Sequence, residues 1–199
     1  MDQNQMFSQM RQAALARLAG RDPKGIARNS GVCYEESTQQ FHIPTLGRTV
    51  TLHYPDYRFA PELPGWHSLV ILHYLDLADG FPLTGKEIPF GQMKSGMVRG
   101  GGIDRRCELA IQNRKDLNED TLAKICESIG GEPVASNADA AFRIPFLPRF
   151  PVTLKIWFPD EDFPASGRML LDAGADHYLT IEDAVTVAEI LLERLTAAK

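Results

Sequence analysis

Residues 66–78, WHSLVILHYLDLA, form the most apolar stretch of the chain, and they decide its fold. A helical wheel gives this stretch two apolar sides, one with Trp66, Leu69, Val70, His73 and Leu77, the other with Ile71, Tyr74, Leu75 and Ala78. A helix that is apolar almost all round is usually enclosed by the rest of the core. The stretch therefore predicts a central helix that ends at Gly80. The predicted core around it includes Trp66, Leu69, Leu77, Ile156, Leu171 and Leu191.

The segments on either side of this helix show shorter helical and strand patterns. Apolar periodicity predicts helices at residues 3–19, 103–114 and 119–129, and a last helix that begins with Thr180 and Asp183 as a variant capping box. Runs of β-forming residues predict strands at 32–35, 40–43, 49–54, 142–146, 152–158 and 169–171. Residues 55–65 contain three prolines and are expected to form an extended surface linker.

The order of these elements predicts the fold class. The strands fall into two groups, with helices before, between and after them, so they do not alternate strictly with helices. Such an order favours an α+β fold with a largely antiparallel sheet packed with helices over a doubly wound parallel sheet. We expect residues 1–199 to form a single domain, with the helix in residues 1–20 at its periphery.

A loop is predicted at residues 81–102, which contain two prolines and six glycines. A loop of that length in a compact domain is often functional or mobile. Glycine also loses more conformational entropy on ordering than other residues do and offers no side chain to pack. We therefore expect residues 91–102 to be more mobile than the helix before them.

Composition and charge narrow the functional classes. The 199 residues include 21 Lys and Arg against 26 Asp and Glu, a net charge of −5, and the short basic clusters are flanked by acids. This balance argues against nucleic-acid binding, which needs concentrated positive charge. No apolar run approaches the roughly 18 residues that suggest a membrane span. Residues 1–10 show no signal-peptide pattern, so we expect a cytoplasmic location without membrane association.

The cysteines and the short motifs assign no cofactor and no metal. Cys33, Cys107 and Cys126 are far apart, so they indicate neither a disulfide framework nor a Cys-x-x-Cys metal or redox site. Three thiolates are also one short of a four-cysteine iron–sulfur site. Residues 83–86, LTGK, lack the spacing of a nucleotide-binding phosphate loop, and there is no Gly-x-Ser-x-Gly motif.

Two stretches carry a family resemblance: ILHYLDLADGFPLTGKEIPF at residues 71–90 and IWFPDEDFPASGRMLLDAGADHYLTIEDA at residues 156–184. Together they resemble the bacterial and archaeal family known as domain of unknown function 3786, over most of the chain after the first helix. The resemblance implies a context in anaerobes, where some members carry an iron–sulfur cysteine cluster attached to this domain. This chain lacks such a cluster. The resemblance therefore implies a fold and a context, and no reaction.

Two groups of residues are candidates for acid–base or metal chemistry. Asp160, Glu161 and Asp162 follow a predicted strand, where carboxylates can bind a hard cation or act as general acids and bases, although they would equally suit a solvated turn. His73 lies three residues before Asp76, so the two can meet on one helical surface. A histidine oriented by a carboxylate suits a metal ligand or a general base, whereas a hydrogen-bonded core histidine is the alternative.

Two further candidates are basic residues in the glycine-rich loop. Lys86, next to Gly85, could hold a carboxylate or a single phosphate, or could belong to a rigid turn on the central helix. Arg99 precedes Gly100, Gly101 and Gly102, whose N–H groups could contact an anion at the start of the next helix, or could form a lid or a plain linker.

These observations lead to a site hypothesis and a function hypothesis. If the protein has a ligand site, we expect it where His73, Lys86, Arg99 and the turn of Asp160, Glu161 and Asp162 converge, because pockets favour such junctions. The mixed charges suit a polar or zwitterionic ligand, and the alternative is an internal salt bridge. The favoured function is a non-catalytic module that binds a small polar ligand or a cofactor. A metal-dependent enzyme that uses the acidic cluster, and a module that docks a protein partner at residues 55–65, are the alternatives.

Overall fold

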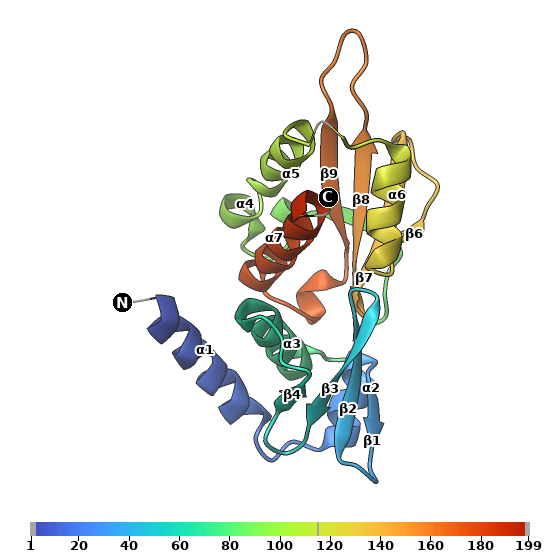
Figure 1. Ribbon diagram of the computed structural model, residues 1–199. Coiled ribbons are helices and arrows are strands. Elements are labelled where there is room, and N and C mark those ends of the chain that lie inside the picture. The colour runs from blue at the N-terminus through green and yellow to red at the C-terminus, as the bar shows by residue number, and fades with distance from the viewer. Residues whose placement is uncertain (1–2, 115, 198–199) are drawn as a thin grey trace.

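The structure is a computed structural model that describes residues 3–114 and 116–197, and it has an α+β fold with two separate antiparallel sheets (Figure 1). The first sheet has the order β1-β2-β3-β4, with β1 (Cys33–Glu35), β2 (Gln40–Thr45), β3 (Arg48–His53) and β4 (Arg58–Ala60). The second has the order β5-β9-β8-β7-β6, with β5 (Glu87–Pro89), β6 (Glu132–Pro133), β7 (Ala140–Leu147), β8 (Phe150–Trp157) and β9 (Ser166–Asp172). The predicted class and antiparallel pairing are confirmed, and the two groups of strands form two sheets rather than one.

The predicted central helix is α3 (Gly65–Leu77), in which every residue from His67 to Leu75 is buried. Four of the predicted core residues are also buried, namely Leu69, Ile156, Leu171 and Leu191. Two others differ. Leu77 is 41% exposed, because the last turn of α3 leaves the core. Trp66 at the other end is half-buried and packs edge-on against Phe7 of α1 (Gln3–Leu18), with ring centroids 5.4 Å apart.

Residues 23–30 and 58–60 form regular elements where none was predicted. The stretch after Gly20 forms α2 (Pro23–Ser30), whose first turn is capped by Asp22. The Asp22 carboxylate accepts the N–H groups of Lys24 at 3.2 Å and Gly25 at 2.9 Å, and a proline in the first turn is compatible with a helix start. Strand β4, within the expected linker at residues 55–65, pairs with β3.

The long loop predicted at residues 81–102 is interrupted by β5, by the short 3₁₀ helix η1 (Phe90–Gln92) and by α4 (Gly96–Arg99). Its glycines have a packing role. A Cβ atom on Gly100 would lie 2.6 Å from the carbonyl carbon of Phe90, and one on Gly96 would also collide with Phe90. Close backbone approach therefore explains these two glycines, and greater mobility of residues 91–102 stays a prediction.

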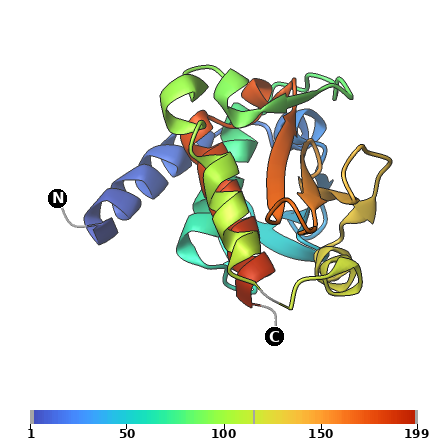
Figure 2. The ribbon, with the colours of Figure 1, turned by 90° about the horizontal axis from the view of Figure 1, so that it is seen from above.

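Helices α5 (Ile103–Gln112) and α7 (Ile181–Ala197) lie on one side of the second sheet, as Figures 1 and 2 both show. Gly167 of β9 permits this packing, since a Cβ atom there would lie 3.2 Å from the Cys107 sulfur and would clash with Ile111. Alternate strand residues point to opposite faces, and Val152, Leu154 and Ile156 of β8 are buried. We call the opposite face of this sheet, which carries Thr153, Lys155 and Trp157 of β8, the outer face.

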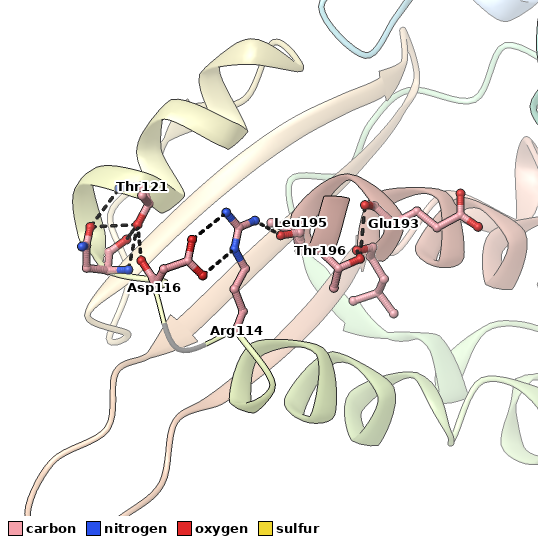
Figure 3. A network of polar contacts seen from close by, with 8 residues as sticks. Arg114, Asp116, Thr121, Glu193, Leu195 and Thr196 are labelled. Atoms are coloured by element: carbon pink, nitrogen blue, oxygen red, sulfur yellow. Dashed lines mark hydrogen bonds and ion pairs between the residues drawn. The ribbon is translucent and has the colours of Figure 1, made fainter. Parts of the chain in front are cut away.

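Figure 3 shows the polar contacts that join the ends of α5 and α7 to the start of α6 (Glu119–Ser128). Arg114 is nearly buried, donates to the carbonyl of Leu195 in the last turn of α7, and pairs with Asp116, with Nε 3.2 Å from Oδ1. Asn118 accepts the N–H of Thr121 at 3.0 Å, which confirms the predicted N-cap of α6. A cation at a helix C-terminus satisfies carbonyls that have no partner within the helix.

Candidate functional site

His73 is buried and lies next to a carboxylate that comes from the other end of the chain. Its Nδ1 is 2.7 Å from Oδ1 of Asp183, and both side chains are about nine-tenths buried. The hydroxyl oxygen of Thr180 accepts the N–H of Asp183 at 3.3 Å, which confirms the predicted capping of α7. The second oxygen of Asp183 accepts the N–H of Thr180 at 3.4 Å and its hydroxyl at 2.8 Å. This arrangement supports the interpretation of His73 as a hydrogen-bonded core histidine that joins α3 to α7.

The predicted pairing of His73 with Asp76 is wrong. Asp76 instead pairs with Arg17 of α1 and with Arg21, whose Nη1 is 3.1 Å from Oδ1, whereas His73 contacts α7. Arg99 also has an acidic partner, since its Nε lies 3.2 Å from Oε1 of Glu182 in the first turn of α7. Both residues therefore take part in contacts that hold helices together.

The acidic residues Asp160, Glu161 and Asp162 lie in the loop between β8 and β9, which extends beyond the sheet at the top of Figure 1. Oδ1 of Asp160 accepts the N–H groups of Asp162 at 2.9 Å and Phe163 at 2.7 Å. The N–H of Asp160 donates to the carbonyl of Phe163 at 3.0 Å. These bonds support the interpretation of a solvated turn, in which Asp160 shapes the backbone and the other two carboxylates are exposed.

The turn before Lys86 is held by Asp172, a buried residue at the end of β9. Its carboxylate accepts the N–H groups of Thr84 at 3.0 Å, Gly85 at 2.8 Å and Gly174 at 2.8 Å, and also the Thr84 hydroxyl. Burial opposes ionisation of this carboxyl group, but the N–H donors stabilise the charged form and lower its pKa below the ordinary value. The rigid-turn interpretation of this segment is therefore supported.

The six predicted site residues do not share one pocket. Asp160 lines a large hollow at the upper end of the outer face, and Lys86 lines a smaller hollow lower on the same face. His73 and Arg99 line neither hollow and are paired with residues of α7. The outer face itself was not predicted as a site, although the alternation of residues along β8 signals it.

The larger hollow has a volume of about 800 Å³ and lies between the β8–β9 hairpin and α5. We call it the aromatic hollow, because Trp157, Phe158 and Phe163 line it. Phe163 is 70% exposed, whereas Trp157 is half-buried. Three cationic residues line it as well, namely Arg105, Lys155 and Arg168.

Each cation of the aromatic hollow has an acidic partner. Nζ of Lys155 lies 2.7 Å from Glu87, and Nε of Arg168 lies 3.7 Å from Asp104. Arg105 pairs with Glu108 one helical turn away, at 3.3 Å. The two arginine pairs are exposed, and exposed ion pairs are weak, so Arg105 and Arg168 remain able to contact an anionic ligand.

The smaller hollow has a volume of about 110 Å³. We call it the basic hollow, and it is lined by Gly85, Lys86, Glu87, Val134, Ala135, Arg143, Pro151, Thr153 and Asp172. The segment between β6 and β7 borders both hollows, since Ala135 lines the basic hollow and Asn137 lines the aromatic hollow. The ion pair of Lys155 with Glu87 joins the two hollows, because Lys155 lines the aromatic hollow and Glu87 lines the basic hollow.

A third hollow, of about 510 Å³, lies between the start of α3 and the end of α7. Trp66, His67 and Ile190 line it, together with Glu189, Glu193 and Arg194. His67 is uncharged at neutral pH, so it adds no positive charge to this hollow. Burial lowers the pKa of this histidine to about 4, and its Nε2 lies 2.8 Å from the Thr45 hydroxyl.

The described residues hold neither a cluster of metal-ligand side chains nor a membrane-spanning helix. No three His, Cys, Asp or Glu side chains in this part of the chain are grouped as a metal ion would need. Burial raises the pKa of the Cys107 and Cys126 thiols to about 12, so neither is a thiolate at neutral pH. Within the same residues, no helix has the length and apolarity of a membrane span.

Comparison with known proteins gives one match. The model of a family described as "Domain of unknown function (DUF3786)" matches residues 22–194. The match includes both of the stretches quoted for the resemblance and leaves α1 outside it. No curated protein and no solved structure matches the chain.

Proposed function

We propose that this chain, which belongs to the family of domain of unknown function 3786, has a non-catalytic role. In that role it binds a small polar ligand that carries a flat ring. The ring would lie against Trp157 and Phe163 in the aromatic hollow, and the polar groups of the ligand would contact the cations around it. The protein would then act as a binding module that presents or carries this ligand.

The observation that carries the proposal is the side chain of Phe163, which is 70% exposed at the edge of a hollow lined with further aromatic and cationic groups. A single exposed apolar residue needs no explanation, but this one faces the same hollow as Trp157. The volume of about 800 Å³ falls within the roughly 300–1,000 Å³ that is typical of small-molecule sites. Aromatic side chains favour offset stacking with planar ligands, and arginine and lysine favour anionic groups.

The alternatives receive less support. An enzyme based on the acidic cluster would need free carboxylates that converge, whereas Asp160 is engaged by two backbone N–H groups and its two neighbours are exposed. A docking surface at residues 55–65 would have to use a segment in which β4 already pairs with β3.

The proposal can be tested with the dye 8-anilinonaphthalene-1-sulfonate, which combines flat aromatic rings with one anionic group. We expect saturable fluorescence enhancement with the folded protein, and an affinity at least fivefold weaker in the Phe163→Ala variant. Ile190→Ala is the matched control, because Ile190 is an aliphatic residue that lines the hollow between α3 and α7. Circular dichroism would verify that both variants are folded.

Two results would overturn the proposal. One is the absence of saturable binding to the folded protein. The other is an affinity that falls in Ile190→Ala and stays unchanged in Phe163→Ala, which would place the dye in the hollow between α3 and α7.

A further inference from the structure

We infer that the basic hollow is a binding site for a single oxyanion group, a phosphate or a carboxylate, held by Lys86, Arg143 and the hydroxyl of Thr153. This inference deepens the proposed function, on which it rests for the identity of the whole ligand, because it adds an anionic group to the ring. The site itself can be tested separately with simple anions.

The strand register places two of these groups side by side. Arg143 of β7 is directly opposite Thr153 of β8, so both side chains lie on the same face of the sheet. Residues opposite each other in an antiparallel pair have Cβ atoms roughly 4.5–5.5 Å apart. Lys86 reaches the hollow from the turn before β5, whose backbone is fixed by Asp172. The site is therefore built on two strands and one restrained turn.

The donors of this hollow are not used within the protein. Among the described residues neither Lys86 nor Arg143 has an acidic partner within 4.0 Å, in contrast to the three cations of the aromatic hollow. Thr153 is only 8% exposed, yet its hydroxyl has no hydrogen-bond partner in the same residues. Since none of their fully buried side-chain polar atoms lacks a partner, this hydroxyl must be reached by solvent. All three groups can therefore donate to a ligand.

Two carboxylates also line the basic hollow, and both have partners. The oxygens of Asp172 accept three backbone N–H groups and one hydroxyl, which occupy them although the carboxylate stays negatively charged. Glu87 pairs with Lys155 at 2.7 Å. Glu132 of β6 is opposite Arg143 in the register, but no ion pair joins the two. The positive charges of Lys86, Arg143 and Lys155 exceed the negative charges of Asp172 and Glu87 by one, so the groups that line the hollow, with Lys155, favour an anion.

The volume of the hollow limits what it can hold. At about 110 Å³ the hollow is well below the roughly 300–1,000 Å³ that is typical of sites for whole small molecules. This space therefore suits one small group, such as a phosphate or a carboxylate. Trp157 lies four positions after Thr153 on β8, which corresponds to about 13 Å at ~3.3 Å per residue. A ligand that spans both hollows would thus carry its ring and its oxyanion about 13 Å apart.

The experiment is isothermal titration calorimetry of the full chain with inorganic phosphate and, in a second arm, with acetate. We expect phosphate binding that weakens at least fivefold in Lys86→Met and in Arg143→Met, and about threefold in Thr153→Val. Glu132→Gln should strengthen it, because that substitution removes a negative charge opposite Arg143 on the same face of the sheet. Arg48→Met is the matched control, since Arg48 is an exposed arginine that lines a different hollow.

The two arms distinguish the source of the oxyanion. Tighter binding of phosphate would assign the hollow to a phosphate group, and tighter binding of acetate would assign it to a carboxylate. Equal loss of binding in Arg48→Met and Arg143→Met, or no binding of either anion, would overturn the inference. Neither of these results would change the expected dye titration of Phe163→Ala. A failure of this inference can therefore be distinguished from a failure of the proposed function.

Discussion

Nδ1 of His73 lies 2.7 Å from Oδ1 of Asp183, a residue 110 positions further along the chain, and both side chains are buried. This pair joins the central helix α3 to the first turn of α7. Asp183 also accepts the Thr180 hydroxyl, so one carboxylate caps α7 and contacts α3 at the same time.

Removing one partner of this pair should therefore be costly. We expect Asp183→Ala to lower the free energy of unfolding by about 3–5 kcal/mol, because it leaves His73 buried without its partner and removes the helix cap. The measurement is urea unfolding at pH 7. In a double-mutant cycle with His73→Leu, the loss in the double variant should be smaller than the sum of the single losses. Additive losses would show that the two residues do not act as a pair.

The position of the last turn of α3 gives a second prediction. Leu72→Ala should lower the free energy of unfolding by about 2–5 kcal/mol, because Leu72 is fully buried, whereas Leu77→Ala should cost less than about 1 kcal/mol. The expected single domain predicts one cooperative urea transition for both variants. A Leu77→Ala loss as large as that of Leu72→Ala would contradict the placement of this turn.

The glycines between α4 and α5 allow a matched comparison. Gly100 and Gly102 both have negative φ angles that alanine can adopt, −81° and −88°. Gly100→Ala should destabilise the protein by about 1–3 kcal/mol, since its Cβ would meet the backbone of Phe90. Gly102→Ala should be neutral or slightly stabilising, because nothing lies within 4 Å of a Cβ there. Thermal unfolding of the two variants provides the comparison, and similar shifts would show that packing does not explain Gly100.

The stability of the protein should depend on pH through His67. Burial lowers the pKa of this residue from 6.5 to about 4, so below pH 6.5 the unfolded chain binds a proton that the folded chain does not. Stability is therefore lost as the pH falls from about 6.5 to 4, by about 3 kcal/mol for a shift of this size. His67→Gln should show a shallower fall over this window in urea unfolding at several pH values. Parallel pH profiles for the wild-type protein and the His67→Gln variant would contradict the lowered pKa of His67.

The sequence predicts local structure better than it predicts contacts between distant residues. The apolar stretch of α3 and the capping residues Asn118 and Thr180 are local patterns, and each is confirmed. The partner of His73 is not local. Spacing within the helix pointed to Asp76, but the side of α3 that each residue faces is set by the packing of α1 and α7.

The outer face was missed for a related reason. The predicted site combined His73, Lys86, Arg99 and the acidic turn, and of these only Lys86 and Asp160 line hollows of the outer face. Asp160 mainly shapes its own turn. Arg143 and Thr153 are ten residues apart and meet only through the register of β7 and β8. Thr153, Lys155 and Trp157 alternate with buried aliphatic residues, a pattern that is typical of a strand with one polar face. The sequence does not tell whether a helix covers that face.

The central claim is that the outer face of the second sheet binds a ligand, and the two tryptophans allow its most direct test. The chain has two tryptophans: Trp157 lines the aromatic hollow and Trp66 lines the hollow between α3 and α7. In a proton–nitrogen correlation spectrum of the ¹⁵N-labelled protein, each gives its own indole N–H signal. Titration with 8-anilinonaphthalene-1-sulfonate should shift the Trp157 signal in a saturable manner and leave the Trp66 signal in place. A saturable shift of the Trp66 signal with no change at Trp157 would contradict the claim.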